Sequence, residues 1–129
     1  MAVDMTMPVL IVDDYKTMLR IVRNLLLQLG FTNIDEAMDG NDAYALLKQK
    51  KYGLVMSDWN MQPVTGLDLL KMVRSDETTK STPFIMVTAE SKTENVVAAK
   101  GAGVNNYIIK PFNLNVLKSK ISAVLGPLP

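Results

Sequence analysis

The apolar positions of this chain form two alternating patterns, short unbroken runs and longer stretches with helical spacing. The short runs are rich in β-branched residues, which is typical of buried strands in a parallel sheet. Four runs are clear and a fifth is weaker. The clear runs cover residues 9–12, 53–57, 84–87 and 107–109, and the weaker run covers residues 33–37.

Between these runs, apolar residues recur every three or four positions, which predicts five helices. The first follows Met18, Val22, Leu25 and Leu29 and ends at Gly30. The second helix contains Ala43, Leu46 and Leu47 and starts near Asn41 or Asp42, and the third contains Leu67, Leu70 and Val73 and opens after Gly66. The fourth covers residues 96–99 and ends in the region of residues 101–103. The fifth contains Leu114, Leu117, Ile121 and Val124 or Leu125, and Asn113 is its predicted cap.

Five strand–helix repeats predict an α/β fold, a doubly wound five-stranded parallel sheet of the (βα)5 type with helices on both faces. We expect one domain over residues 1–129, with a core from about residue 8 to residue 125. Right-handed crossovers bring every strand's carboxyl end to the same edge of such a sheet. Ligands bind at that edge, near the point where the strand order reverses.

Composition narrows the chemistry. The chain has 129 residues, is 48% apolar and carries a formal charge of +1, which favours neither nucleic acid nor anionic lipid. It contains no cysteine and no histidine, so thiolate sites, serine–histidine triads and an internal phosphohistidine are excluded. No apolar stretch approaches the roughly 20 residues that cross a bilayer. We expect a soluble, cytoplasmic monomer that binds no nucleic acid and inserts in no membrane.

Acidic residues follow two of the predicted strands at the functional edge. Asp13 and Asp14 come directly after the first run, and Asp58 follows the run at residues 53–57. Magnesium prefers oxygen ligands and usually takes one or two carboxylates from a protein, so these acids predict a magnesium site. Asp58 would also be the nucleophile that accepts a phosphoryl group. For Asp14 helix capping is an equally good reading, and a lone Asp after a strand is usually a cap or turn former.

A hydroxyl and a lysine complete the predicted cluster. Thr88 ends the run at residues 84–87, and its hydroxyl could donate to a phosphoryl oxygen, although threonine is also common in strands. Lys110 follows the last run and could pair with Asp58 and then with the phosphoryl group, although most lysines are simply solvated. Whether the Lys110–Pro111 bond is cis is left open. Each signal is weak alone, and their joint placement on strand ends is the strong observation.

Four segments resemble the receiver domain of bacterial two-component response regulators, over about residues 9–125. They read Leu-Ile-Val-Asp-Asp at residues 10–14, Ser-Asp-Trp-Asn-Met at 57–61, Val-Thr-Ala-Glu at 87–90 and Tyr-Ile-Ile-Lys-Pro-Phe at 107–112. The match is most similar to the stand-alone receivers of chemotaxis. The resemblance implies a flavodoxin-like fold with strand order 2-1-3-4-5.

The resemblance also implies roles for the matching positions. Asp58 is the phosphoacceptor, and Thr88 and Lys110 contact the phosphoryl group. The implied magnesium ligands are Asp13, Asp14, Asp58 and the backbone carbonyl of Asn60. The remaining implied roles are an aromatic switch at Tyr107, coupled to Thr88, and tuning of the phosphoryl lifetime by Asn60 and Glu90. Receivers of this kind usually carry proline directly after Met61, whereas here Gln62 precedes Pro63, which puts the shape of that loop in doubt.

The implied partners are a histidine kinase, the flagellar motor switch protein and a phosphatase. The expected output face is formed by the fourth helix, the fifth strand and the fifth helix, with the candidate contacts Lys92, Val96, Lys100, Tyr107 and Lys118. Of the neighbours Val96 and Val97, we expect Val97 to point into the core.

Three other functions stay open to different degrees. A phosphate sink or relay would use the same site without binding a motor. A small aspartate-nucleophile phosphatase is disfavoured because Asn60, two residues after Asp58, cannot act as an acid, and no segment could cap a substrate. A flavodoxin is disfavoured because acids after Val12 would repel a flavin phosphate. The leading prediction is therefore not an enzyme, apart from its own phosphoryl transfer and dephosphorylation.

Overall fold

The computed structural model describes residues 3–89 and 93–129, and in these the strands form one parallel sheet in the order β2-β1-β3-β4-β5. This order and the flavodoxin-like fold confirm the prediction. The strands are β1 (Val9–Val12), β2 (Ile34–Ala37), β3 (Leu54–Asp58), β4 (Phe84–Thr88) and β5 (Asn106–Ile109). Chain order and spatial order differ at β1, which pairs with both β2 and β3, so the strand order reverses beside it.

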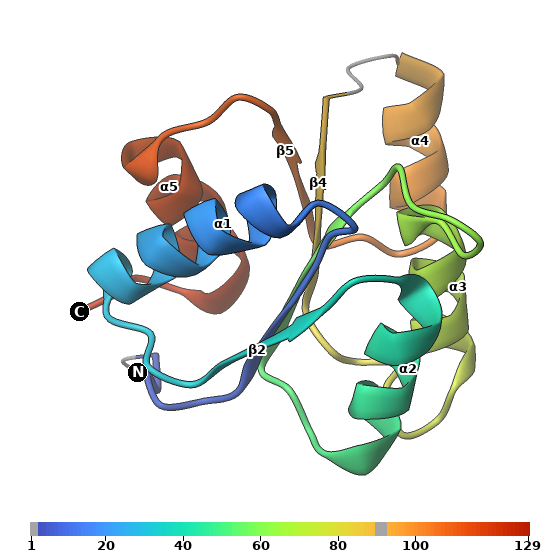
Figure 1. Ribbon diagram of the computed structural model, residues 1–129, viewed down its shortest axis with the longest axis horizontal. Helices are drawn as coiled ribbons and strands as arrows, with labels where there is room; N and C mark the ends of the chain where they lie inside the picture. Colours follow the sequence, from blue (N-terminus) through green and yellow to red (C-terminus); the bar gives the residue numbers. More distant parts are fainter. Residues whose placement is uncertain (1–2, 90–92) are drawn as a thin grey trace.

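Five helices alternate with the strands, as the apolar spacing predicts. They are α1 (Lys16–Leu29), α2 (Gly40–Gln49), α3 (Gly66–Ser75), α4 (Thr93–Gly101) and α5 (Leu114–Leu125). Helices α1 and α5 cover one face of the sheet, and α2, α3 and α4 lie on the other (Figure 1). In the described part of the chain, no helix is both long and apolar enough to span a bilayer.

Helix boundaries follow local capping chemistry. Gly30 ends α1 in a left-handed conformation, and Asn113 caps α5 by accepting a hydrogen bond from the Val116 amide, both as predicted. The cap of α2 is Asp39, which accepts from the Asp42 amide, and the helix starts at Gly40, next to the predicted start near Asn41 or Asp42. Three neighbouring polar residues could each cap, and only the extended backbone of Asp39 places its carboxylate correctly.

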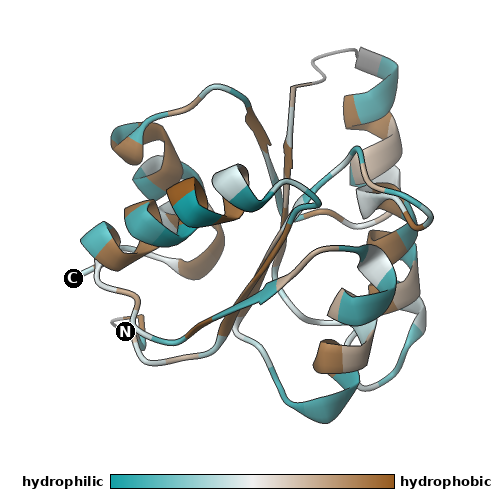
Figure 2. Ribbon diagram, viewed as in Figure 1, coloured by the Kyte–Doolittle hydropathy of each residue, from teal (hydrophilic) through white to brown (hydrophobic). Residues whose placement is uncertain are grey.

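Each face of the sheet buries its own apolar cluster. Figure 2 shows the hydropathy of the residues along the strands and helices that supply these clusters. The α1 and α5 side buries Leu19, Val22 and Leu26 with Leu117 and Ile121 against alternate residues of the strands. The other side buries residues of α2 and α3, including Leu69 and Leu70. The inner strands β1, β3 and β4 are buried on both faces, which explains why they appear as unbroken apolar runs.

Helix α4 departs from the prediction. Val97, expected to face the core, is 61% exposed, and Val96 is only partly buried. The residue that α4 buries completely is Ala99. Valine at two adjacent positions cannot show which side of a helix faces inward. The predicted residues Glu90 and Lys92 lie outside the described residues.

Candidate functional site

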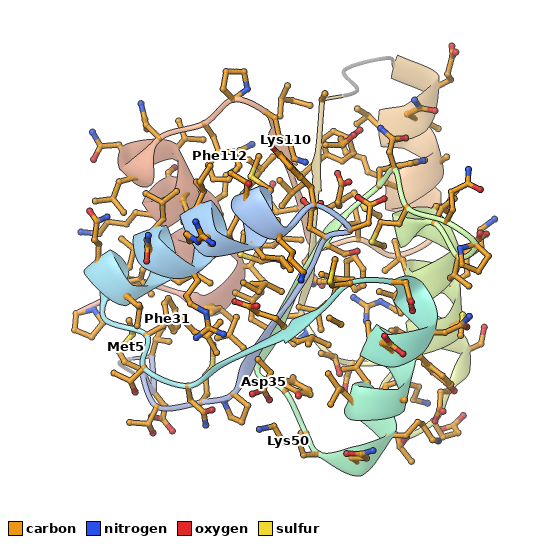
Figure 3. All side chains as sticks on the ribbon, in the orientation of Figure 1. Met5, Phe31, Asp35, Lys50, Lys110 and Phe112 are labelled. Carbon is orange, nitrogen blue, oxygen red and sulfur yellow. The ribbon has the colours of Figure 1, made fainter. Side chains whose placement is uncertain are left out.

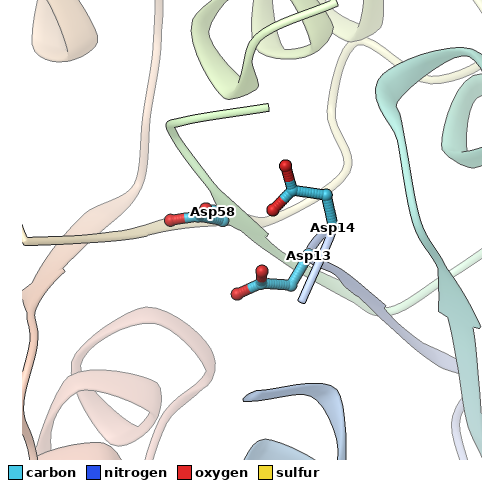
Figure 4. Close-up of side chains that lie close together, drawn as sticks. All are labelled: Asp13, Asp14 and Asp58. Carbon is cyan, nitrogen blue, oxygen red and sulfur yellow. The ribbon is translucent and has the colours of Figure 1, made fainter. Parts of the chain in front are cut away.

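The first part of the site is a pair of buried carboxylates on neighbouring strands. Asp13 follows β1 directly, and Asp58 ends β3. Because Val12 pairs with Ser57, the next residue of each strand lies side by side at the carboxyl edge. Asp13 is 5% exposed and Asp58 7% exposed, whereas their neighbour Asp14 is exposed. One carboxylate oxygen from each of these three acids lies within 4.8 Å of the others (Figure 4).

Strand alternation assigns the two buried acids to the α1 and α5 side of the sheet. Asp13 follows Ile11 by two residues and Asp58 follows Met56 by two, so each continues a row of this apolar cluster. A cavity of about 10 Å³ lies beneath them, lined in part by Leu19 of α1. That volume is close to the minimum that one water molecule needs, so the core beneath the two acids is closely packed.

Lys110 is the third element of the site. It follows β5, its amide donates to the carbonyl of Thr88 at 2.8 Å, and its bond to Pro111 is cis. The ammonium lies 3.1 Å from Asp58 Oδ1 and 3.4 Å from Asp13 Oδ2. The predicted pair with Asp58 is therefore present, and Asp13 joins it. Figure 3 places Lys110 at the end of the sheet opposite Asp35 and Lys50.

Burial dominates the electrostatics of Asp13. Loss of water around its carboxylate raises the pKa of Asp13 above its ordinary value, and the charge of Asp58 adds to this. The hydrogen bond that Asp13 accepts from the Tyr15 amide at 2.9 Å acts in the opposite direction, as does Lys110. One ammonium among three carboxylates leaves two formal negative charges, which makes the cluster ready to accept a cation.

The donor set fits magnesium. Opposite ligands of an octahedral magnesium ion lie about 4.2 Å apart, twice the 2.0–2.1 Å bond length, so oxygens within 4.8 Å need only small shifts or one bridging water. All three donors are hard carboxylate oxygens, and exposed Asp14 leaves a side open for water ligands. Asn60, whose backbone carbonyl is the fourth predicted ligand, is an exposed residue of the loop after β3.

The loop after Asp58 is held by its own backbone. The carbonyl of Trp59 accepts from the amide of Met61 at 3.1 Å and from the amide of Gly66 at 2.9 Å. A β-carbon on Gly66 would overlap the carbonyl oxygen of Asp58, so only glycine lets α3 start this close to the acid. The pattern of residues predicts Gly66 as a helix start, but not this contact. The Gln62–Pro63 bond in the loop is cis.

The second part of the site lies on the other side of the sheet. Tyr107 pairs with Met86, and Thr88 follows Met86 by two residues, so Thr88 and Tyr107 point to the face of α2, α3 and α4. Thr88 is fully buried and Tyr107 is partly buried. The ring of Tyr107 meets that of Trp59 edge-on, with centroids 6.4 Å apart. Trp59 is the neighbour of Asp58, and this aromatic pair connects the acidic loop with β5.

A groove of about 90 Å³ separates α4 from β5. It is lined by Val96 and Lys100 of α4, by Asn106 and Tyr107 of β5, and by Val104 and Asn105 between them. Three of the predicted partner contacts therefore meet here, namely Val96, Lys100 and Tyr107. Lys118 is exposed on α5 and does not line the groove.

Comparison with known proteins adds to this geometry. The response regulator receiver domain family matches residues 9–122. The chain is 50% identical over 118 residues to "Chemotaxis protein CheY" of Pseudomonas aeruginosa, covering 92% of this chain and 95% of that protein. It is 49% identical over 122 residues to "Chemotaxis protein CheY-3" of Vibrio cholerae, covering 95% and 94%. The solved structure of V. cholerae CheY4 has a TM-score of 0.87 at 32% identity, covering 93% of this chain and 99% of that one.

Proposed function

Because the chain belongs to the response regulator receiver domain family, we propose that it is a binding module gated by phosphorylation of Asp58. The donor is a phosphohistidine of a partner histidine kinase, as membership of this family suggests. The chain has no histidine that could serve as an internal donor. The observation that carries this proposal is the contact of the Lys110 ammonium with both Asp58 and Asp13 at the sheet edge.

The transfer is a displacement at phosphorus. A carboxylate oxygen of Asp58 forms the new P–O bond, the P–N bond to the donor imidazole breaks, and the imidazole leaves with the electron pair and takes up a proton. Lys110, 3.1 Å from Asp58 Oδ1, holds the carboxylate beforehand and then pairs with a phosphoryl oxygen. Thr88 donates its hydroxyl to another phosphoryl oxygen.

Asp13, Asp14, Asp58 and the backbone carbonyl of Asn60 would hold magnesium. The ion supplies positive charge that offsets the repulsion between the carboxylates and the incoming phosphoryl group. The two formal negative charges that Lys110 leaves unbalanced, and the buried position of Asp13, support this assignment. Asn60 and Glu90 tune how long the acyl phosphate lasts.

Phosphorylation is coupled to the groove between α4 and β5 through Thr88 and Tyr107. The phosphoryl group adds up to about two negative charges, which pull Thr88 and Lys110 toward Asp58. Tyr107 then turns into the space beside Thr88, and the groove that Tyr107 lines changes shape. Lys92 and Lys118 add charge to this output face.

The partner proposed for this face is the flagellar motor switch protein, in the cytoplasm, because the relatives at 49–50% identity are chemotaxis proteins. A dedicated phosphatase ends the signal. A phosphate sink would show the same phosphorylation without motor binding, so the output experiment below separates the two functions.

The chemistry is tested by incubation with acetyl phosphate and magnesium, followed by intact mass measurement. Wild type gains one phosphoryl group, and Asp58→Asn gains none. Labelling of Asp58→Asn to the wild-type extent would overturn the assignment. Magnesium alone should change the fluorescence of Trp59, the only tryptophan, because the ion binds beside it. A flat titration would contradict the metal site.

The output is tested with a motor switch peptide and beryllofluoride, a mimic of the acyl phosphate. Beryllofluoride should raise the affinity of wild type by roughly 5- to 150-fold, the usual range of coupling between two sites. Tyr107→Ala should keep phosphorylation and lose most of this gain. An unchanged gain in Tyr107→Ala would rule out the aromatic switch, and no gain in wild type would favour the phosphate sink.

A further inference from the structure

Arg74, which no site prediction includes, makes an unusual set of contacts near the end of α3. Its guanidinium donates four hydrogen bonds, and all of them leave its own helix. Nε donates to the carbonyl of Gly103 at 2.9 Å, Nη1 donates to the carbonyls of Lys80 at 3.1 Å and Thr82 at 2.7 Å, and Nη2 donates to Asn105 Oδ1 at 2.8 Å. One side chain thus joins α3 to the loop before β4 and to the turn between α4 and β5.

The acceptors of Arg74 are themselves fixed to the sheet and to α4. Asn105 Oδ1 also accepts from the amide of Phe84 at 2.8 Å, and the Asn105 amide donates to the Phe84 carbonyl at 2.9 Å. Gly103 has a φ of +93°, and a β-carbon there would lie 3.2 Å from Arg74 Nε. Glycine is therefore required at this turn both for its backbone conformation and to let the arginine lie against it.

The chemistry of these contacts explains why arginine stands here. All four acceptors are neutral oxygens, three of them main-chain carbonyls, so the guanidinium acts as a fork that holds several backbone segments at once. Gly103 follows the carboxyl end of α4, where a cation also interacts favourably with the helix dipole. Burial lowers the pKa of Arg74, and the four hydrogen bonds offset the loss of water.

The clamped turn forms one end of the groove between α4 and β5. Val104 and Asn105, which line the groove, follow Gly103 directly. Apolar packing holds α4 only weakly, because Ala99 is the single α4 residue that is fully buried among those described. The position and the tilt of α4 therefore depend largely on the polar contacts at its carboxyl end.

We propose that Arg74 is a positioning residue that fixes the carboxyl end of α4 to the start of β5 and thereby sets the affinity of the groove for its partner. This inference rests on the proposed function for the identity of the partner, but not for the clamp itself. Arg74 bonds to none of the acids and does not line the groove. It acts by holding the carboxyl end of α4 in place, so that only the rest of the helix can shift when Asp58 is phosphorylated.

The test compares the full chain with Arg74→Lys, which keeps the charge and loses the fork. Arg23→Lys is the matched control, because Arg23 pairs with Glu36 on the opposite side of the sheet. Binding of the motor switch peptide with beryllofluoride should weaken roughly 2- to 30-fold in Arg74→Lys, as for residues that modulate coupling from outside both sites. The response of Trp59 to magnesium should stay within about twofold of wild type in both variants.

Hydrogen exchange provides a readout that needs no partner. The amides of Val104 and Asn105 donate to Ala99 and Phe84, and both should exchange faster in Arg74→Lys, while α1 amides stay unchanged. Wild-type exchange at these two amides would overturn the clamp. If wild type gains no affinity with beryllofluoride, the proposed function fails and exchange alone decides about Arg74. If exchange rises but binding equals wild type, the role in affinity is overturned. Should Arg74→Lys not fold, Arg74→Gln, which keeps part of the hydrogen bonding without the charge, takes its place.

Discussion

The α1 and α5 side of the sheet and the α4 side are built differently. Helix α1 buries three residues and α5 two in a shared cluster, and the row of this cluster continues into Asp13 and Asp58. Among its described side chains, helix α4 buries only Ala99 completely, and it leaves Val97 61% exposed. The proposed phosphoryl transfer needs fixed atoms, and the acids lie on the side that α1 and α5 pack firmly. A response costs least free energy where packing is thin, and the groove lies there.

Truncation of one apolar side chain on each side tests this difference most strongly. Leu26→Ala removes a fully buried side chain of α1 and should lower the free energy of unfolding by about 2–5 kcal/mol. Val97→Ala on α4 should change it by less than about 0.5 kcal/mol, because the side chain is exposed. Urea unfolding measures both. Similar losses in the two variants would mean that α4 is packed as firmly as α1.

A pair of glycines sharpens the comparison at the site itself. Gly66→Ala should cost about 1–3 kcal/mol, because the added carbon overlaps the Asp58 carbonyl and α3 must move away. It should also slow labelling by acetyl phosphate. Gly101→Ala, at the end of α4, meets nothing within 4 Å and should gain about 0.4–1 kcal/mol through the unfolded state. Thermal unfolding of both variants gives the sign, and a neutral Gly66→Ala would show that the loop can adjust.

The smallest effect concerns Asp76, which directly follows α3 and connects it to α2. Arg74, two residues earlier, is part of the same end of α3. The ion pair with Lys48 and the hydrogen bond from Tyr44 hold the pKa of Asp76 well below its usual value. A lowered pKa in the folded state stabilises the protein above the unfolded pKa near 4, and the contribution disappears as pH falls below it. The melting temperature of wild type should therefore exceed that of Asp76→Asn at pH 7, and the gap should shrink below about pH 4. A gap independent of pH would assign the difference to packing.

The sequence predicted the fold well because its signals are local and repeated. Unbroken apolar runs marked the strands, and Gly30 and Asn113 marked helix ends, since each acts through its own backbone. The meeting of Asp13, Asp14, Asp58 and Lys110 followed from topology, because parallel strands bring their carboxyl ends to one edge. The roles of these residues in metal binding and transfer stay predictions.

What the sequence could not supply depends on tertiary contact. The prediction of which side of α4 faces the core was wrong, because two adjacent valines do not indicate the inward side. A fully buried alanine carries little signal in a sequence. The hydrogen bonds of Arg74 end mostly on main-chain carbonyls, which exist at every position and leave no pattern. The closeness of Gly66 to Asp58 arises from the return of a loop, and a glycine before a helix has many ordinary explanations.

The exposure of Val97 also makes the proposed motion measurable. The chain has no cysteine, so thiol-reactive spin labels would attach only to cysteines that are introduced. Suitable positions are Val97 on α4 and Ile21 on α1, which is 45% exposed. The distance distribution between the labels, recorded with and without beryllofluoride, would report how far α4 travels relative to the packed side of the molecule.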